Sequence, residues 1–221
     1  MEGCVIKEWK DANVTPLFKK GNRNMVQNYR PISLTSIPCK ILESIIKDQV
    51  TRYLERNNLI KVSQHGFTSG RSCLTNLLEY LEYVTSKVDE QKPVDCIYFD
   101  FSKAFDKVPH QRLLIKLNSF GIKGRVGLCI KNWLADRRQR VVLNGTYSGW
   151  LPVLSGVPQG SVLGPLLFLL YVNDIDDTVT SKICKFADDT KIFTEVSSEL
   201  TTTRVQNDIN SLLKWSGKWQ K

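Results

Sequence analysis

The chain has 221 residues, of which 42% are hydrophobic, so it can bury a sizeable core as one large domain or two lobes. With 31 lysines and arginines against 22 aspartates and glutamates, its formal net charge is +9, which favours a polyanionic partner. The longest apolar stretch, Val162 to Val172, is too short for a membrane span of about 20 residues, and the charged N-terminal residues exclude a secretory signal.

The first half of the chain predicts two helices and one buried strand after an irregular basic segment. The first helix runs from about Cys39 to Asn57, and a second runs from about Leu74 to Glu90, before Pro93. An apolar run carrying Asp100 near its end follows as a strand. The apolar face expected on the first helix consists of Leu42, Ile45, Ile46, Val50, Tyr53 and Leu54.

The second half predicts helices, hairpins and one buried helix. Helical patterns cover roughly 111–119 and 126–136, and a strand at 140–143 leads into an Asn144-Gly145 turn. A loop at 155–160 precedes a buried helix from about 161 to 175, an acidic hairpin and a last helix from about 198. Because strands and helices are interleaved without βαβ alternation, the expected fold class is α+β with an antiparallel sheet.

Two acidic sites lie among apolar residues. Phe186-Ala187-Asp188-Asp189 is explained equally well by a metal site or by a solvated Asp-Asp turn. Asp100, which lies in an apolar and aromatic strand earlier in the chain, favours metal binding. Carboxylates on neighbouring strand ends could hold two Mg²⁺ ions, which suits phosphoryl transfer.

Glycines and basic residues give weaker signals. The loop Ser155 to Gly160 lets backbone approach a ligand closely, and Gln159 can bind a base edge or sugar, but a plain turn before a helix explains it as well. Each basic run is more typical of a solvated face than of a site. These runs are Lys19-Lys20, Arg23, Arg30 and Arg137-Arg138-Gln139-Arg140.

Seven motifs occur in one order along the chain, and together they resemble the reverse transcriptase domain of non-LTR (LINE-type) retrotransposons of the jockey and CR1 groups. The resemblance covers about Trp9 to Trp219. The motifs are Pro16 to Gly21, Asn28 to Leu34, Lys40 to Glu43, Gln64-His65-Gly66-Phe67, Phe99 to Asp106, Gly156 to Pro165 and Phe186 to Asp189.

The resemblance implies a right-hand polymerase whose palm sheet is antiparallel and flanked by helices. It places fingers at 1–92 and a palm at 93–221, without a thumb, so a truncated domain is expected. Asp100, Asp188 and Asp189 are then catalytic. Asp100, Asp188 and the backbone carbonyl of Phe101 would bind two Mg²⁺ ions, or Mn²⁺ in their place, while Asp189 would be a less direct ligand.

The resemblance also implies a set of nucleotide-binding residues. Lys19, Lys20 and Arg30 would hold the triphosphate, and Arg suits bidentate phosphate contact. Phe105 would be a steric gate against the ribose 2′-hydroxyl, and ordinary core packing is its alternative. Gln159 and Gly160 would lie against the incoming nucleotide and the template.

Other acidic residues have structural explanations. Asp106 is expected to pair with Lys103 or to cap the next helix, and Asp174, Asp176 and Asp177 to lie in a solvated turn. The scattered cysteines, which never form C-x-x-C, indicate a reduced intracellular protein without structural zinc.

The resemblance implies an RNA-directed DNA polymerase that uses an RNA template, a DNA primer and dNTPs, and that lies in the nucleus. A catalytically idle remnant that only binds nucleic acid is the alternative. A metal-dependent phosphatase or another palm polymerase is a more distant possibility, because neither explains the Gly-Val-Pro-Gln-Gly and Tyr-Arg-Pro-Ile-Ser motifs.

Overall fold

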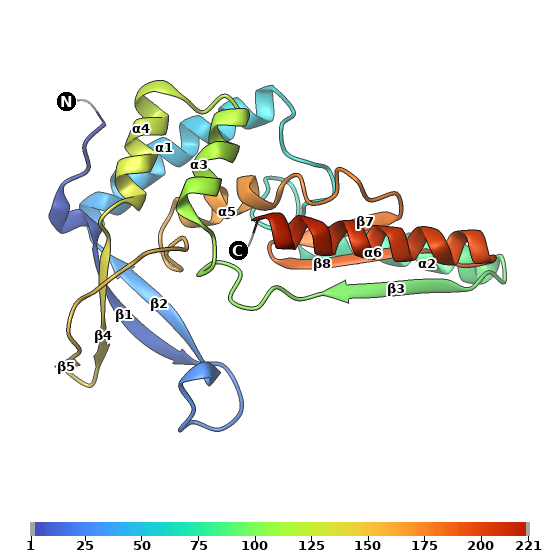
Figure 1. Ribbon diagram of the computed structural model, residues 1–221, viewed down its shortest axis with the longest axis horizontal. Coiled ribbons are helices and arrows are strands. Elements are labelled where there is room, and N and C mark those ends of the chain that lie inside the picture. Colours follow the sequence, from blue (N-terminus) through green and yellow to red (C-terminus); the bar gives the residue numbers. More distant parts are fainter. Residues whose placement is uncertain (1–2, 220–221) are drawn as a thin grey trace. The chain divides into compact units, whose positions relative to one another are not determined.

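The computed structural model describes residues 3–219 (Figure 1). Its helices are α1 (Ile37–Arg56), α2 (Cys73–Asp89), α3 (His110–Ser119), α4 (Gly124–Leu134), α5 (Gly164–Val172) and α6 (Glu199–Trp219), with short 3-10 helices η1 (Lys7–Lys10) and η2 (Val26–Asn28). Its strands are β1 (Asp11–Phe18), β2 (Tyr29–Thr35), β3 (Val94–Phe99), β4 (Arg138–Leu143), β5 (Thr146–Tyr147), β6 (Leu151–Pro152), β7 (Lys182–Phe186) and β8 (Asp189–Glu195). No helix within these residues is both long and apolar enough to cross a membrane.

The chain folds into two compact units, each made from two separate stretches. Unit 1 contains 1–57 and 105–168, and unit 2 contains 58–104 and 169–221. These two units differ from the predicted division, which placed a single boundary between residues 92 and 93. The assignment of fingers and palm stays a prediction. The outermost residues of both predicted subdomains, 1–2 and 220–221, lie outside the described residues.

Unit 1 contains a sheet in the segment that the sequence predicted to be irregular, which corrects that expectation. Its strand order is β2-β1-β4-β5, with β6 also paired to β4. Strands β1 and β2 are antiparallel, whereas β4 runs parallel to β1. The N-terminal third of the chain therefore begins with a hairpin rather than with coil.

Prolines hide this hairpin from pattern analysis, because each strand contains one. Pro16 and Pro31 lie directly opposite each other. The Lys19 N–H donates to the Asn28 carbonyl (2.8 Å), so by alternation the Pro16 rung is one that needs no N–H between these strands. The missing donors therefore fall where the β1–β2 ladder requires none.

Helix α1 has the predicted position, but its buried face is rotated from the predicted one. Ile45 and Tyr53 are exposed. Glu43 is fully buried (0% exposed) and accepts from Trp133 Nε1 (2.9 Å) and from the backbone N–H of Val162 (2.6 Å). A carboxylate with internal donors can occupy a core position that apolar periodicity alone assigns to solvent.

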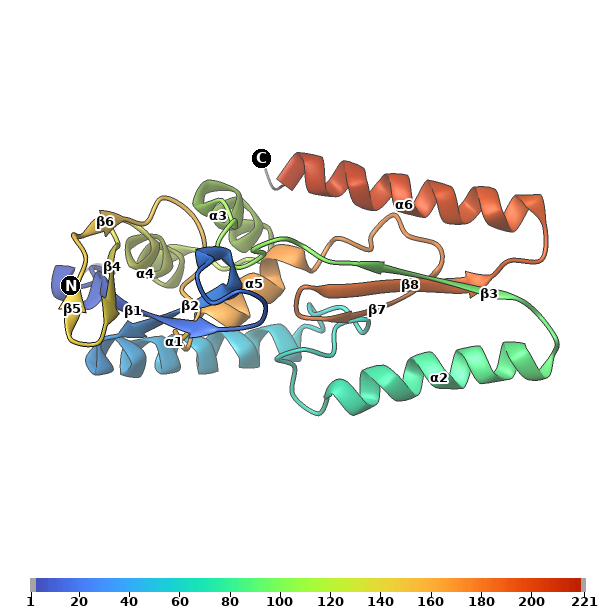
Figure 2. The same ribbon diagram turned by 90° about the horizontal axis from the view of Figure 1, so that it is seen from below.

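Unit 2 is a three-stranded antiparallel sheet in the order β3-β8-β7, with α2 and α6 on opposite faces (Figures 1 and 2). From α2, Tyr80 and Tyr83 pack edge-on against Phe193 of β8. From α6, Arg204 donates to Thr194 Oγ1 (2.7 Å). The predicted antiparallel sheet flanked by helices is confirmed.

Candidate active site

The acidic residues gather at one end of the unit 2 sheet. Strands β7 and β8 are joined by a two-residue turn, Ala187-Asp188, because Phe186 pairs with Asp189. Strand β3 lies beside β8 with Phe99 opposite Thr190, so the register brings Asp100, which follows Phe99, opposite Asp189. Asp100 thus comes close to Asp188 and Asp189, two adjacent residues far from it in sequence, at the strand ends and the adjoining turn.

The turn has an unfavourable backbone at Ala187. Its φ is +55°, in the left-handed region. An alanine there costs roughly 1–2 kcal/mol, and two-residue hairpin loops that need a positive φ at their first position favour Gly. The direction in which Asp188 leaves the turn therefore depends on interactions that hold Ala187.

A hollow of about 460 Å³ lies beside this end of the sheet, next to the start of α2. Asp100 and Asp189 both line it, and both are exposed. Asp188 is half-buried in the turn and is not among the lining residues. The lining residues are Cys73, Asn76, Tyr98, Phe99, Asp100, Cys184, Phe186, Asp189, Thr190 and Lys191.

The donor set fits a hard divalent cation. Mg²⁺ takes carboxylate oxygens and usually completes its shell with water and substrate phosphates. Within residues 3–219, no ion pair neutralises Asp100 or Asp189. The three aspartates do not converge as closely as a preformed cage would require, since the one trio of potential ligand atoms within 4.8 Å of one another in the described chain lies elsewhere.

The predicted triphosphate-binding residues all lie on the β1–β2 hairpin of unit 1. Lys19 and Lys20 directly follow β1 and are exposed. Arg30 is exposed on β2, opposite Leu17. The hairpin that the sequence missed is thus the element that carries these three cations.

The predicted nucleotide loop is fixed to β2. The backbone carbonyl of Gln159 accepts from the Ser33 N–H (2.7 Å). The side-chain Nε2 of Gln159 donates to Asp106 Oδ1 (3.3 Å). Gly160 has φ +110°, and a Cβ there would lie 2.5 Å from the Ser33 carbonyl oxygen, so no larger residue fits. Asp106 therefore contacts this loop, a partner that the sequence analysis did not name.

Phe105, the predicted steric gate, packs within unit 1. Its ring stacks on buried Phe168, with centroids 4.2 Å apart. This contact bears out core packing for Phe105. Its contact with a nucleotide stays a prediction.

Comparison with known proteins identifies the family. A family model described as reverse transcriptase (RNA-dependent DNA polymerase) matches residues 18–220. The chain belongs to the reverse transcriptase family. The resemblance inferred from its motifs is confirmed.

The relatives include mobile-element proteins of Drosophila melanogaster. The chain is 27% identical to a probable RNA-directed DNA polymerase from transposon BS, over 96% of this chain and 24% of the relative. It is 28% identical to the RNA-directed DNA polymerase from mobile element jockey, over 98% of this chain and 25% of the relative. This reverse transcriptase chain thus spans about a quarter of the length of these curated relatives.

Solved structures support the fold. Telomerase from Candida tropicalis in complex with a fragment of telomeric RNA matches with a TM-score of 0.68 at 14% identity, over 96% of this chain and 40% of that one. Apo telomerase from the same organism, truncated from its C-terminal domain, matches with a TM-score of 0.65 over 93% of this chain and 47% of that one, also at 14% identity. The mixed α and β architecture predicted for this reverse transcriptase is confirmed.

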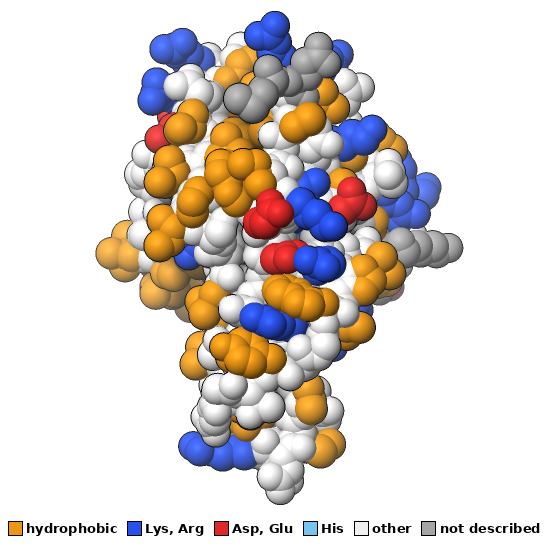
Figure 3. Space-filling view, turned by 90° about the vertical axis from the view of Figure 1, so that its left-hand side faces the viewer, with side chains coloured by type: hydrophobic (Ala, Val, Ile, Leu, Met, Phe, Trp, Pro, Cys, Tyr) orange, Lys and Arg blue, Asp and Glu red, His pale blue; other side chains and the backbone are white. Residues whose placement is uncertain are grey.

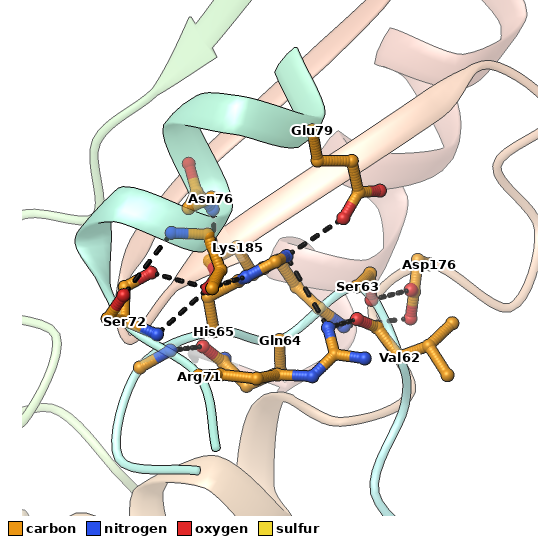
Figure 4. Close-up of polar contacts among 12 residues, drawn as sticks. Val62, Ser63, Gln64, His65, Arg71, Ser72, Asn76, Glu79, Asp176 and Lys185 are labelled. Atoms are coloured by element: carbon orange, nitrogen blue, oxygen red, sulfur yellow. Dashed lines mark hydrogen bonds and ion pairs between the residues drawn. The ribbon is translucent and has the colours of Figure 1, made fainter. Parts of the chain in front are cut away.

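A second cluster in unit 2 was not predicted (Figure 4). His65 Nε2 lies 3.0 Å from Glu79 Oε2, and its Nδ1 lies 2.8 Å from Thr75 Oγ1. Cys184 completes the trio of potential metal ligands with His65 and Glu79. Burial, and then Glu79, raise the pKa of the Cys184 thiol to about 12, which disfavours the thiolate that a metal needs. We therefore interpret this reverse transcriptase cluster as a hydrogen-bonded support.

The structure also corrects the expectations for two charged runs. Arg137 is buried (1% exposed), with its guanidinium over the Trp133 ring, whereas Arg138 pairs with Asp11 (2.6 Å). Asp176 is not solvated, because it accepts from Lys185 Nζ (2.9 Å) in a buried ion pair. Sequence runs of like charge gave no signal of these internal partners.

Two half-buried arginines of the basic run, Arg138 and Arg140, lie beside exposed aromatic rings on unit 1. Arg140 lies over the rings of Tyr147 (4.2 Å) and Trp150 (4.5 Å), and Arg138 lies 5.2 Å from the Trp150 centroid. Figure 3 shows basic and apolar side chains next to one another on this side, with acidic side chains beside some of the basic ones. Such a surface suits the phosphates and bases of a nucleic acid.

Proposed function

We propose that this chain is the core of an RNA-directed DNA polymerase, which joins a dNTP to a primer 3′-hydroxyl opposite an RNA template. One observation carries the proposal: in a member of the reverse transcriptase family, Asp100, Asp188 and Asp189 converge at one end of the unit 2 sheet. Carboxylates at that end can hold the divalent ions that phosphoryl transfer requires.

Each predicted residue has a role in this proposal. Asp100 and Asp188, with the backbone carbonyl of Phe101, would hold two Mg²⁺ ions or two Mn²⁺ ions, and Asp189 would support them. When bound, such ions polarise the phosphate and increase the acidity of the primer hydroxyl. The triphosphate would be held by Lys19, Lys20 and Arg30. Phe105, Gln159 and Gly160 would contact the sugar and base of the nucleotide.

The names of the Drosophila relatives support the reaction, and the basic surface of unit 1 supports contact with a template and primer. Nuclear localisation belongs to the same proposal, because reverse transcription primed at a chromosomal target takes place there. Imaging of the tagged chain in cells would test it.

Asp188→Asn is expected to reduce primer extension by more than the roughly 10- to 100-fold that loss of an outer-shell partner of a metal site costs. The substitution keeps the size of the side chain and removes the charge that holds a cation. The measurement is Mg²⁺- and Mn²⁺-dependent extension of a DNA primer on an RNA template, with folding checked by circular dichroism.

Asp95→Asn is the control, because it makes the same change at an exposed aspartate of β3, which pairs with Thr194 at the other end of the ladder. It should retain extension. Full activity in Asp188→Asn would contradict the assignment. A folded parent that binds template–primer without extending it would instead favour the idle nucleic-acid-binding remnant.

A further inference from the structure

We propose that Gln64 is a positioning residue, which holds the Ala187-Asp188 turn and so sets the direction of the Asp188 carboxylate. Gln64 belongs to the Gln64-His65-Gly66-Phe67 motif and is 2% exposed. Its role in catalysis rests on the function proposed above, whereas its contacts with the turn do not.

The side chain of Gln64 binds both backbone polar groups of Ala187. Its Oε1 accepts from the Ala187 N–H (3.0 Å), and its Nε2 donates to the Ala187 carbonyl (3.4 Å). Oε1 also accepts from the Gly66 N–H (2.8 Å), which orients the amide. One buried side chain thus grips the left-handed residue that precedes Asp188.

The backbone on either side of Gln64 is docked along β7, as Figure 4 shows for its neighbours. The Lys185 N–H donates to the Ser63 carbonyl (2.8 Å), and the His65 N–H donates to the Lys185 carbonyl (2.8 Å). These two bonds form a parallel bridge between Gln64 and Lys185. The amide therefore reaches Ala187 from a fixed base.

Gly66 allows the approach to be this close. A Cβ at Gly66 would lie 2.4 Å from the Ala187 nitrogen. Because that nitrogen is a backbone atom, no side-chain movement could relieve the clash. Gly66 and Gln64 thus act on the same atom by different means, one by leaving space and the other by accepting its hydrogen. Their joint effect is a turn with one backbone geometry at Ala187.

Gln64→Met separates this role from general stability, because methionine has a similar length and removes both polar atoms. Gln64→Glu keeps an oxygen that can accept from the Ala187 and Gly66 N–H groups, and in the neutral form that burial favours, its hydroxyl can donate to the Ala187 carbonyl as Nε2 does. Asn173→Leu is the matched control, since its buried amide also bridges backbone groups of unit 2, accepting from the Lys61 N–H (3.0 Å) and donating to the Leu59 carbonyl (2.9 Å).

Two measurements on the full chain need no turnover: Mn²⁺ affinity by electron paramagnetic resonance, and hydrogen exchange of the Ala187 amide. Gln64→Met should bind Mn²⁺ about 10- to 100-fold more weakly and exchange Ala187 at least about tenfold faster. Gln64→Glu and Asn173→Leu should stay close to the parent in both.

Parental affinity and protection in Gln64→Met would overturn the proposal, as would equal losses in Asn173→Leu. If Gln64→Met does not fold, Gln64→Glu decides, because a folded glutamate variant that has lost Ala187 protection contradicts the role of Oε1. A parent that does not extend primers, yet shows these Gln64-dependent changes, removes the proposed function and leaves the positioning role standing.

Discussion

His110 illustrates how the fold sets the protonation of a single side chain. Its Nε2 donates to the Gly156 carbonyl (2.8 Å), at the start of the loop that contains Gln159. Partial burial lowers the pKa of His110 below its usual value of 6.5, although this hydrogen bond opposes the shift. The folded protein therefore favours the neutral form of the His110 ring.

Because of His110, the stability of the fold should decrease as the pH is lowered. As pH drops through about 6.5, the unfolded chain binds a proton more readily than the folded chain, and stability is lost until the lowered folded pKa is passed. His110→Gln, which keeps a donor for Gly156, should show a smaller decrease between neutral and mildly acidic pH. Urea unfolding at both pH values measures it, with the exposed neighbour variant Gln111→Ala as the control. Equal pH dependence in parent and His110→Gln would contradict the role of His110.

At the scale of elements, periodicity predicted helices more reliably than it predicted their buried faces. Helix α2 begins and ends within one residue of its predicted bounds, yet none of its residues is fully buried. Leu74, Leu78 and Val88 are more than half exposed. Its start is fixed instead by local hydrogen bonds, in which Ser72 Oγ accepts from the Thr75 N–H (3.2 Å) and Thr75 Oγ1 accepts from the Ser72 N–H (2.9 Å).

Ser72→Ala is expected to destabilise unit 2 by about 1 kcal/mol, because it leaves the first turn of α2 without its N-cap acceptor. Urea unfolding, together with faster hydrogen exchange in that turn, checks the expectation. Ser86→Ala within α2 should be neutral or slightly stabilising, since alanine favours the helix interior. A loss in Ser86→Ala as large as that in Ser72→Ala would count against the cap.

For the whole molecule, charge rather than shape sets the expected behaviour toward nucleic acid. The net charge of +9 favours phosphate backbones at long range. Part of the basic run is internal, since Arg137 is buried, so half-buried Arg140 and the exposed rings beside it carry more of the expected contact than the sequence count implies. Binding and turnover should therefore respond to different residues.

Affinity for an RNA–DNA duplex should fall at least about tenfold between about 50 and 200 mM salt, equally in the parent and in Asp188→Asn. Arg140→Gln should reduce the slope of log affinity against log salt by about 1, and its neighbour variant Gln139→Ala should not. Fluorescence anisotropy with a labelled duplex measures both. A salt-independent affinity would contradict phosphate binding.

Sequence alone determined the helix positions, the acidic hairpin with Asp100 opposite it, and the family, because periodicity and short motifs are properties of neighbouring residues. It missed the β1–β2 hairpin, whose prolines are harmless only in one register. Tertiary structure decided which charges are internal, as with Glu43, Arg137 and Lys185, and which residue grips Ala187. Those outcomes depend on partners many residues away, such as Trp133 for Glu43 and Ala187 for Gln64. A polar group can be buried without a large free-energy cost only where such a partner exists.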